Sequence, residues 1–391
     1  MSFFSDFSFF FILALLMMGA AYLGLHERSM RRYGLYASIF MLFALFVKTP
    51  LEGLFCCIFL ADSLLCAHFL WGDPKSARRF HIALALTLVP LVACKVSGAF
   101  SANILGFIGI SYVTFRSVQV LVETHDGLIE RMKMSDYLYF LIFFPTFTSG
   151  PIDRSRRFEE DLDNVPSKDE YSGMLANAIL LIMLGMVYKI VLATIFEKYW
   201  VPEYFNQYNE GTAVAIWRQF RNCIAYGLYL FFDFAGYSWM AEGAGLAFGI
   251  HVPRNFRAPF LSTSITDFWN RWHITLSTWL RDFCFMRIAR SLMRRKAFKG
   301  KSARLRTAQT AMIANMLIMG FWHGLSIDYI LYGLYHGVLL ALEQSWERTK
   351  FYKTHRHKTW YRICSWAVTM ALVFFGFALF CGQITLLVKG A

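Results

Sequence analysis

The chain has 391 residues, of which 57% are hydrophobic and only 17% are charged. Soluble proteins carry about a quarter charged residues, so this composition excludes an ordinary soluble globular protein and favours a membrane protein. The formal net charge is +13. Because the basic residues gather in loops between apolar runs, positive-inside topology explains the excess, and we expect no nucleic-acid partner.

Apolar runs along the chain predict an all-α polytopic membrane protein. A helix needs roughly 20 apolar residues to cross a bilayer, and several runs are shorter. We therefore expect one integral-membrane domain over residues 1–391, with about 11 transmembrane helices plus surface or re-entrant helices. The runs cover residues 7–25, 33–47, 51–71, 80–96, 104–122, 137–147, 174–196, 220–234, 240–250, 312–321, 329–342 and 364–388.

Two stretches among these runs are unlike a lipid-facing helix. Residues 145–157 read PTFTSGPIDRSRR, and their Pro and Gly-Pro predict a break in the backbone, where Asp153 could pair with Arg154. Residues 231–238 read FFDFAGYS and place Asp233 inside an aromatic run. A carboxylate in such surroundings is a candidate to line a polar cavity.

Residues 266–283 carry two stripes at helical spacing. Thr266, Asn270, His273, Ser277 and Arg281 form a polar stripe, and it lies beside an aromatic stripe of Trp269, Trp272, Leu276, Trp279 and Phe283. This pattern predicts one helix with a wet cavity on one side, lined by Asn270 and Ser277. An interfacial helix with tryptophan anchors and one solvated histidine is the alternative.

The next segment is strongly basic. Residues 281–306 contain ten Lys or Arg and one acid, Asp282, which indicates the cytoplasmic side. As a helix, the segment presents an apolar face opposite its arginines, so it either lies on anionic lipid or docks an acidic cytoplasmic protein. The candidate docking residues are Phe285, Met286, Ile288, Ala289, Arg290, Leu292 and Arg294.

His323 ends a long apolar run, with Gly324 after it and the next predicted helix beginning near Asp328. A titratable ring at membrane depth is costly and is often functional, although a structural histidine bonded to a carbonyl is the alternative. Imidazole is suited to proton transfer near neutral pH, so His323 and His273 are candidate general bases. His336 is a weaker candidate, because thirteen residues rotate it away from His323.

The motifs of several other enzyme classes are absent from the sequence. There is no Gly-rich phosphate loop, no GxSxG elbow and no Cys or His spacing typical of a metal site, so we expect no metal and no bound cofactor. A general base without a visible nucleophile is suited to removing a proton from a hydroxyl that attacks an activated acyl group.

The blocks FWNRWHITLSTWLRDF and MGFWHG resemble the signature of the membrane-bound O-acyltransferase family. With GISYVTFRSVQVLVETHDG, FPTFTSGPIDRSRRFEED, LFFDFAGYS and LYGLYHG, the resemblance extends over about residues 109–337 and is strongest to the bacterial D-alanyl transfer members. It implies a ring of membrane helices around a central funnel, in a multi-pass protein of the bacterial plasma membrane. His323 matches the family's catalytic histidine and His273 its second one.

The resemblance also implies the substrates and partners. The donor would be D-alanine held as a thioester on the phosphopantetheine arm of an acidic carrier protein, which docks from the cytoplasm near residues 285–295. The acceptor would be an extracytoplasmic hydroxyl of teichoic acid, reached directly or through accessory membrane proteins.

Two other functions remain open from the residues. An O-acetyltransferase for alginate or peptidoglycan would share the buried histidine and the cytoplasmic acyl donor. A transporter would use charged residues in apolar surroundings, such as Asp233, Lys189 and Glu242. Sparse intramembrane charge and the lack of an inverted repeat argue against transport.

Overall fold

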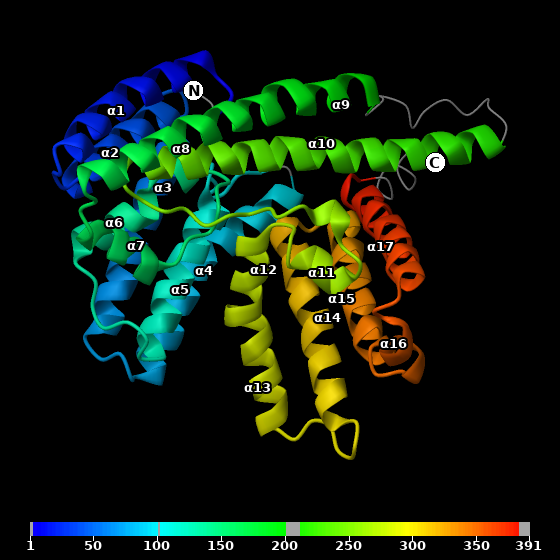
Figure 1. Ribbon diagram of the computed structural model, residues 1–391. Helices are drawn as coiled ribbons and strands as arrows, with labels where there is room; N and C mark the ends of the chain where they lie inside the picture. Colours follow the sequence, from blue (N-terminus) through cyan, green and yellow to red (C-terminus); the bar gives the residue numbers. More distant parts are fainter. Residues whose placement is uncertain (1–2, 101, 201–211, 383–391) are drawn as a thin grey trace. The chain divides into compact units, whose positions relative to one another are not determined.

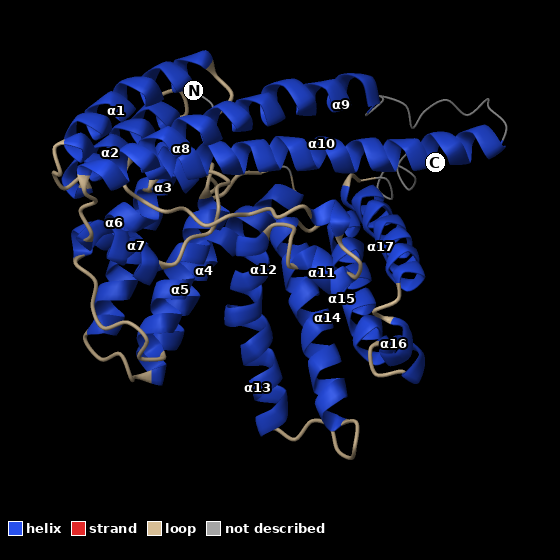
Figure 2. Cartoon of the chain, viewed as in Figure 1, coloured by secondary structure: helices blue, strands red, loops and turns tan. Residues whose placement is uncertain are grey.

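The computed structural model describes residues 3–100, 102–200 and 212–382 (Figure 1). Within these ranges the regular elements are all helices, as Figure 2 shows, so the predicted all-α class is confirmed. The chain divides into two compact units, residues 1–190 with 235–254 and residues 191–234 with 255–391.

The first unit contains the amino-terminal helices. They are α1 (Phe7–Leu25), α2 (Arg31–Phe46), α3 (Pro50–Trp71), α4 (Ala77–Ala99), α5 (Ile110–His125), α6 (Met134–Ile142), η1 (Phe144–Thr146), α7 (Ser155–Asp163), α8 (Lys168–Met186), the start of the π-helical turn η2 (Val187–Leu192) and the end of α10 (Thr212–Ala247). Part of its core is a cluster formed by Tyr139, Phe143 and Phe158, whose ring centroids lie 5.2–5.6 Å apart.

A buried arginine closes the break after α6. Arg116, on α5, is 1% exposed and donates to the carbonyl oxygens of Phe140 at 2.8 Å and Leu141 at 3.0 Å. It also donates to the carbonyl oxygen of Thr146, at 2.7 Å. Carbonyls at the end of a helix have no partner within that helix, and Arg116 supplies one. The run containing Arg116 was predicted only as an apolar span.

The predicted break is present between η1, which ends at Thr146, and α7, which begins at Ser155 within the predicted range 145–157. The side chain paired with Asp153 is that of Arg157, whose Nε donates to Asp153 Oδ1 at 2.9 Å, while Arg154 donates its backbone N–H. Asp153 thus contacts Arg154 through the backbone N–H and also forms an ion pair with Arg157, which the sequence did not predict. Arg157 lies in the first turn of α7, and its side chain reaches back to Asp153 in the segment that precedes the helix. Burial raises the pKa of the Asp153 carboxyl, and Arg157 opposes that rise.

Residues 220–234 and 240–250 were predicted as separate helices, but α10 runs through both. Gly236 lies between these two predicted runs, and it allows two helices to pack closely instead of ending a helix. A Cβ added there would lie 2.6 Å from the backbone nitrogen of Lys189 and 2.7 Å from the carbonyl oxygen of Gly185. A glycine can thus allow two helix backbones to approach without interrupting either helix.

The second unit carries the carboxyl-terminal helices. They are α9 (Ala193–Trp200), the first part of α10, η3 (Pro259–Leu261), α11 (Ile265–Trp269), α12 (Ile274–Leu280), the π-helical turn η4 (Arg281–Phe285), α13 (Met286–Arg294), α14 (Ala303–His323), α15 (Ile327–Trp346), α16 (Lys350–His355) and α17 (Thr359–Phe380). Helices α13, α15 and the turn η4 pack on α14, and α17 packs on α15.

Five helical stretches of the described residues are long and apolar enough to cross a membrane. They are Phe7–Leu25, Pro50–Trp71, Ala77–Ala99, Lys168–Lys198 and Thr359–Phe380. The chain is therefore a multi-pass membrane protein, and the figure of about 11 spans stays a prediction. The predicted run 104–122 becomes helical only at Ile110, and the end of the predicted run 364–388 lies outside the described residues.

Candidate active site

The α14–α15 hairpin sets the position of His323. The break predicted at Gly324 is confirmed, since α14 ends at His323 and α15 begins at Ile327. Glycines let the two helices approach closely: a Cβ at Gly320 would collide with the carbonyl oxygen of Tyr329, and one at Gly333 would lie 2.5 Å from that of Met316. Such contact fixes the end of α14 against the start of α15.

The imidazole of His323 lies in an aromatic setting and is half-buried. Its ring centroid is 4.8 Å from that of Phe380 on α17. It is 5.8 Å from the ring of Tyr329 and 6.4 Å from that of Tyr332, both on α15. Rings from two neighbouring helices therefore restrict the imidazole while leaving part of it accessible.

His273 lies at a break that the sequence did not predict. The expected continuous helix ends at Trp269 and restarts at Ile274, with His273 at φ 43° and ψ 52° between them. A non-glycine residue in this left-handed region is strained, and such residues cluster at functional sites. The predicted polar stripe is consequently wrong in one respect: His273 is 5% exposed and leaves the face shared by Asn270 and Ser277.

Asn255 holds the ring of His273. Its Oδ1 accepts from the backbone N–H of Thr275 at 3.3 Å and from the Thr275 hydroxyl at 2.6 Å. Because a backbone N–H can only donate, this atom is an oxygen, so His273 Nδ1, at 3.3 Å, must carry a hydrogen and donate to it. The neutral ring then presents Nε2 as an acceptor.

Helix α17 links the surroundings of the two histidines. Phe377 packs on Trp272, the residue before His273, with ring centroids 5.0 Å apart, and Phe380 packs on His323 one turn later. One helix therefore contacts both His323 and the residue before His273, which lie about fifty residues apart in sequence.

A pocket of about 440 Å³ lies beside α11, α12, η4, α14 and α15. The described residues that line it include Asn270, Ser277 and Arg281 from the predicted polar stripe and Phe285 from the predicted docking segment. Asn315 also lines it, and its buried Oδ1 has no hydrogen-bond partner in the described part of the chain. An unpartnered buried amide oxygen can accept a hydrogen bond from a ligand that enters.

The predicted docking helix is present as α13, Met286–Arg294. Ala289 is buried and Phe285, Ile288 and Leu292 are half-buried, whereas Arg290 and Arg294 are exposed. Met286 and Met293 are 48% and 55% exposed. Exposed methionines beside exposed arginines form an adaptable apolar surface with positive charge around it.

Asp233 lies on α10 and is half-buried. His273, His323 and Asp233 are not among the described residues that line the 440 Å³ pocket. Within the described residues no group of three or more His, Cys, Asp or Glu side chains could hold a metal ion.

Sequence reasoning missed Asn255 and ranked His336 as a weaker candidate than His323. His336 is 1% exposed and its Nδ1 accepts a hydrogen bond from Trp269 Nε1 at 3.4 Å. Its ring packs on Tyr332, which also contacts His323. Asn255 follows Pro253 and Arg254 in an irregular stretch. No pattern in the sequence linked it to His273, which lies 18 residues later.

The sequence profile of the membrane-bound O-acyltransferase family matches residues 34–385. A teichoic acid D-alanyltransferase of Bacillus subtilis is 35% identical over 397 residues, which cover 97% of this chain and 98% of that protein. One from Streptococcus thermophilus is 43% identical over 69% of this chain, which spans 65% of that relative's length.

A probable alginate O-acetylase of Pseudomonas syringae is also similar. It is 32% identical over 70% of this chain, and the match spans 48% of its own length.

Proposed function

Because this chain belongs to the membrane-bound O-acyltransferase family, we propose that it transfers D-alanine from a cytoplasmic carrier-protein thioester toward an extracytoplasmic hydroxyl of teichoic acid. The observation that carries this proposal is the similarity to the Bacillus subtilis teichoic acid D-alanyltransferase, which extends over nearly all of both chains. The two histidines at helix breaks in one unit supply a site suited to such a transfer.

His323 is the general base in this proposal. It takes the proton of the acceptor hydroxyl while the oxygen attacks the thioester carbonyl, so that a C–O bond forms and the C–S bond breaks. The proton then passes to the departing thiolate, which leaves as the carrier's thiol. A positioned general base typically accelerates such a step about 10²–10⁴-fold. Its partly accessible ring at the end of α14 suits this role.

His273 orients a reactant through its acceptor nitrogen. With Nδ1–H donated to Asn255, the neutral ring offers Nε2 to an N–H or O–H group of the donor arm or the acceptor. In this tautomer Nε2 carries no hydrogen, so His273 cannot donate a hydrogen bond from it to the thioester carbonyl. We therefore assign His273 to positioning and His323 to proton transfer.

The carrier docks on α13 and its phosphopantetheine arm enters the pocket of about 440 Å³. Phe285 belongs to both surfaces, because it ends η4 at the start of α13 and lines the pocket. The arm contains amide groups, and the polar side chains of Asn270, Ser277 and Asn315 are suited to them. Exposed Arg290 and Arg294 steer an acidic carrier toward the helix.

A second candidate is O-acetylation of an envelope polysaccharide, favoured by the similarity to the probable alginate O-acetylase. Both functions use an activated acyl donor and a general base, so the donor decides between them. Transport alone has no support from the family.

One experiment separates these functions. The purified protein is incubated with carrier protein loaded with radiolabelled D-alanine or acetate, together with an acceptor polymer, and the label is followed. D-alanine should leave the carrier and acetate should remain. Transfer of acetate alone would favour O-acetylation, and retention of both labels by the carrier would refute the proposal.

A further inference from the structure

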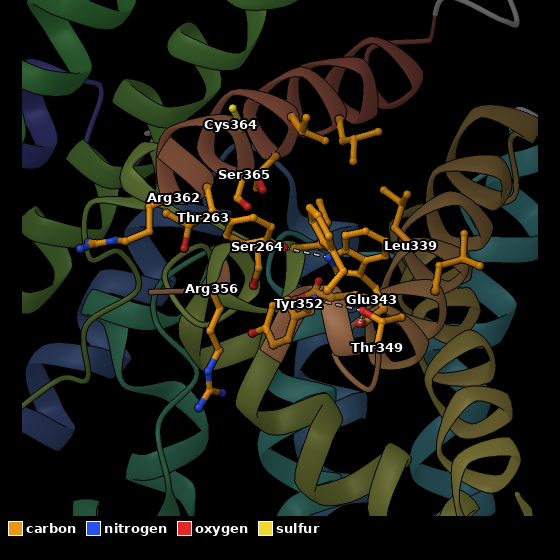
Figure 3. A pocket seen from close by; sticks show the side chains of 18 of the residues that line it. Thr263, Ser264, Leu339, Glu343, Thr349, Tyr352, Arg356, Arg362, Cys364 and Ser365 are labelled. Atoms are coloured by element: carbon orange, nitrogen blue, oxygen red, sulfur yellow. Dashed lines mark hydrogen bonds between the residues drawn. The ribbon is translucent and has the colours of Figure 1, made fainter. Parts of the chain in front are cut away.

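A second pocket, of about 780 Å³, lies where the end of α15, α16 and the start of α17 meet (Figure 3). Neither His273 nor His323 is among the described residues that line it. Its volume falls within the range of roughly 300–1,000 Å³ that is typical of small-molecule sites. The acyl-transfer chemistry proposed above makes no use of it.

The pocket has an apolar wall built from α15 and α17. Leu339 and Leu342 line it from α15, and Val368 and Leu372 line it from α17. Leu342 is 60% and Val368 is 59% exposed, although both are aliphatic. Since α17 is long and apolar enough to cross the membrane, these exposed side chains form a surface suited to an acyl chain.

The pocket is positively charged on the side away from Leu339. Arg356 and Arg362 line it, and Figure 3 shows both on the side away from Leu339. They belong to residues 348–362, which contain six Lys or Arg and no Asp or Glu. By the positive-inside rule this segment lies on the cytoplasmic side, where the leaflet carries anionic lipid.

Aromatic residues also line the pocket. Trp346 and Trp360 line the pocket and are 46% and 48% exposed, and Trp346 Nε1 donates to the Tyr361 hydroxyl at 2.9 Å. Tryptophan and tyrosine favour the depth of the lipid headgroups. The acid that lines the pocket, Glu343, accepts the backbone N–H of Thr266 at 3.0 Å and is thereby held toward α11.

We propose that this pocket binds an anionic glycerophospholipid of the cytoplasmic leaflet. The phosphate lies at Arg356 and Arg362, the glycerol region lies among the aromatic rings, and one acyl chain follows the wall formed by α15 and α17. Positive charge and apolar surface in the lining of one pocket match an amphipathic anion. The inference is independent of the acyl-transfer function, since it concerns other residues and a binding readout.

The test measures lipid binding to the full-length protein in detergent. The probe is dioctanoyl phosphatidylglycerol, titrated against the wild type and against R356Q/R362Q, with native mass spectrometry reporting the bound fraction. The matched control is K353Q/K358Q, which removes the same charge from exposed residues of the same segment outside the pocket. We expect the pocket variant to bind about tenfold more weakly and the control within about twofold of the wild type.

A third variant and two competitors make the result decisive. V368W should fill the apolar wall and weaken lipid binding while thermal unfolding stays unchanged, because Val368 is exposed. Dioctanoyl phosphatidylcholine should compete poorly. Equal weakening by both glutamine pairs would overturn the site in favour of diffuse surface charge. Displacement of the lipid by millimolar inorganic phosphate would identify a free-anion site, and equal binding of phosphatidylcholine would remove the requirement for negative charge.

Discussion

At the scale of residues, the surroundings of His273 restrict its imidazole ring more than the surroundings of His323 restrict that ring. His273 is buried, left-handed in backbone conformation and bonded to Asn255, whereas His323 is half-buried and surrounded by rings. The more constrained ring suits positioning and the more accessible ring suits proton transfer. The difference in burial and backbone conformation was not visible in the sequence, where both are histidines after tryptophan in similar motifs.

Replacing His323 tests the general base. His323→Ala should lower D-alanyl transfer by about 10²–10⁴-fold without reducing the amount of protein in the membrane. Transfer is measured as loss of label from the loaded carrier. His355→Ala, at the end of α16, serves as the control. Turnover of His323→Ala near that of the wild type would exclude the role.

Replacing Asn255 tests the orientation of His273. Asn255→Asp keeps an oxygen that accepts from Thr275 and His273, whereas Asn255→Leu removes it. We expect Asn255→Leu to reduce transfer by about 100-fold, as small misplacements of positioned groups do, and Asn255→Asp to recover most of the rate. Carrier binding should be the same in both variants. Equal defects in both would mean that Asn255 matters only for folding.

At the scale of elements, unit 2 joins a basic amphipathic helix to a pocket through one π-helical turn. The turn η4 supplies Arg281 and Phe285 to the pocket, and α13 continues from it with exposed methionines and arginines. Helical π-turns are rare and frequently mark functional sites. A partner bound to α13 would therefore be adjacent to the pocket without any movement of the chain.

Charge reversal on α13 tests the docking surface. R290E/R294E should weaken binding of the acidic carrier by at least tenfold at low salt, because both arginines are exposed and attract it. K299E/K301E reverses the same charge in the following loop and should have a smaller effect. Affinity is measured by titrating fluorescent carrier into the detergent-solubilised protein. Identical effects of the two pairs would place docking elsewhere.

The close α14–α15 contact can be tested through its glycines. Gly320→Ala should destabilise the protein by about 1–3 kcal/mol, because the added methyl group meets the carbonyl of Tyr329. Gly173→Ala on α8 has open space around it and should be neutral or stabilising by up to about 1 kcal/mol. Thermal unfolding in detergent reports both. A stable Gly320→Ala variant would mean that the hairpin relaxes easily.

At the scale of the whole molecule, composition predicted the helical class and the family signature predicted the kind of enzyme. The helix break at Gly324 was also predictable, since this glycine separates two apolar runs, the second of which begins near Asp328. The break before His273 was not predictable, because residues 267–280 contain no Pro or Gly and keep helical spacing. There Asn255, from a distant segment, holds the chain in a left-handed turn.

The burial of Arg116 in unit 1 was likewise not predictable from the sequence. Arg116 lies in a predicted apolar span, and its partners are backbone carbonyls whose availability depends on where α6 ends. Sequence patterns describe side chains and do not show which backbone groups lack a partner.

Arg116→Met should therefore cost at least about 2 kcal/mol of stability, because it leaves buried carbonyls without donors. The stability of Arg116→Lys should lie between that of the wild type and that of Arg116→Met, since an ammonium can reach some of these oxygens. Thermal unfolding of the detergent-solubilised variants is the measurement. Stability of Arg116→Met equal to the wild type would show that water or lipid replaces the guanidinium.

Helix α17 contributes two apolar side chains to the surroundings of the histidines. Phe377 and Phe380 are hydrocarbon side chains without any reactivity, yet one touches the neighbour of His273 and the other touches His323. A single turn of α17 thus contacts the surroundings of both imidazole rings. Trimming either benzyl group would alter the packing around the two imidazoles from a helix that carries neither histidine.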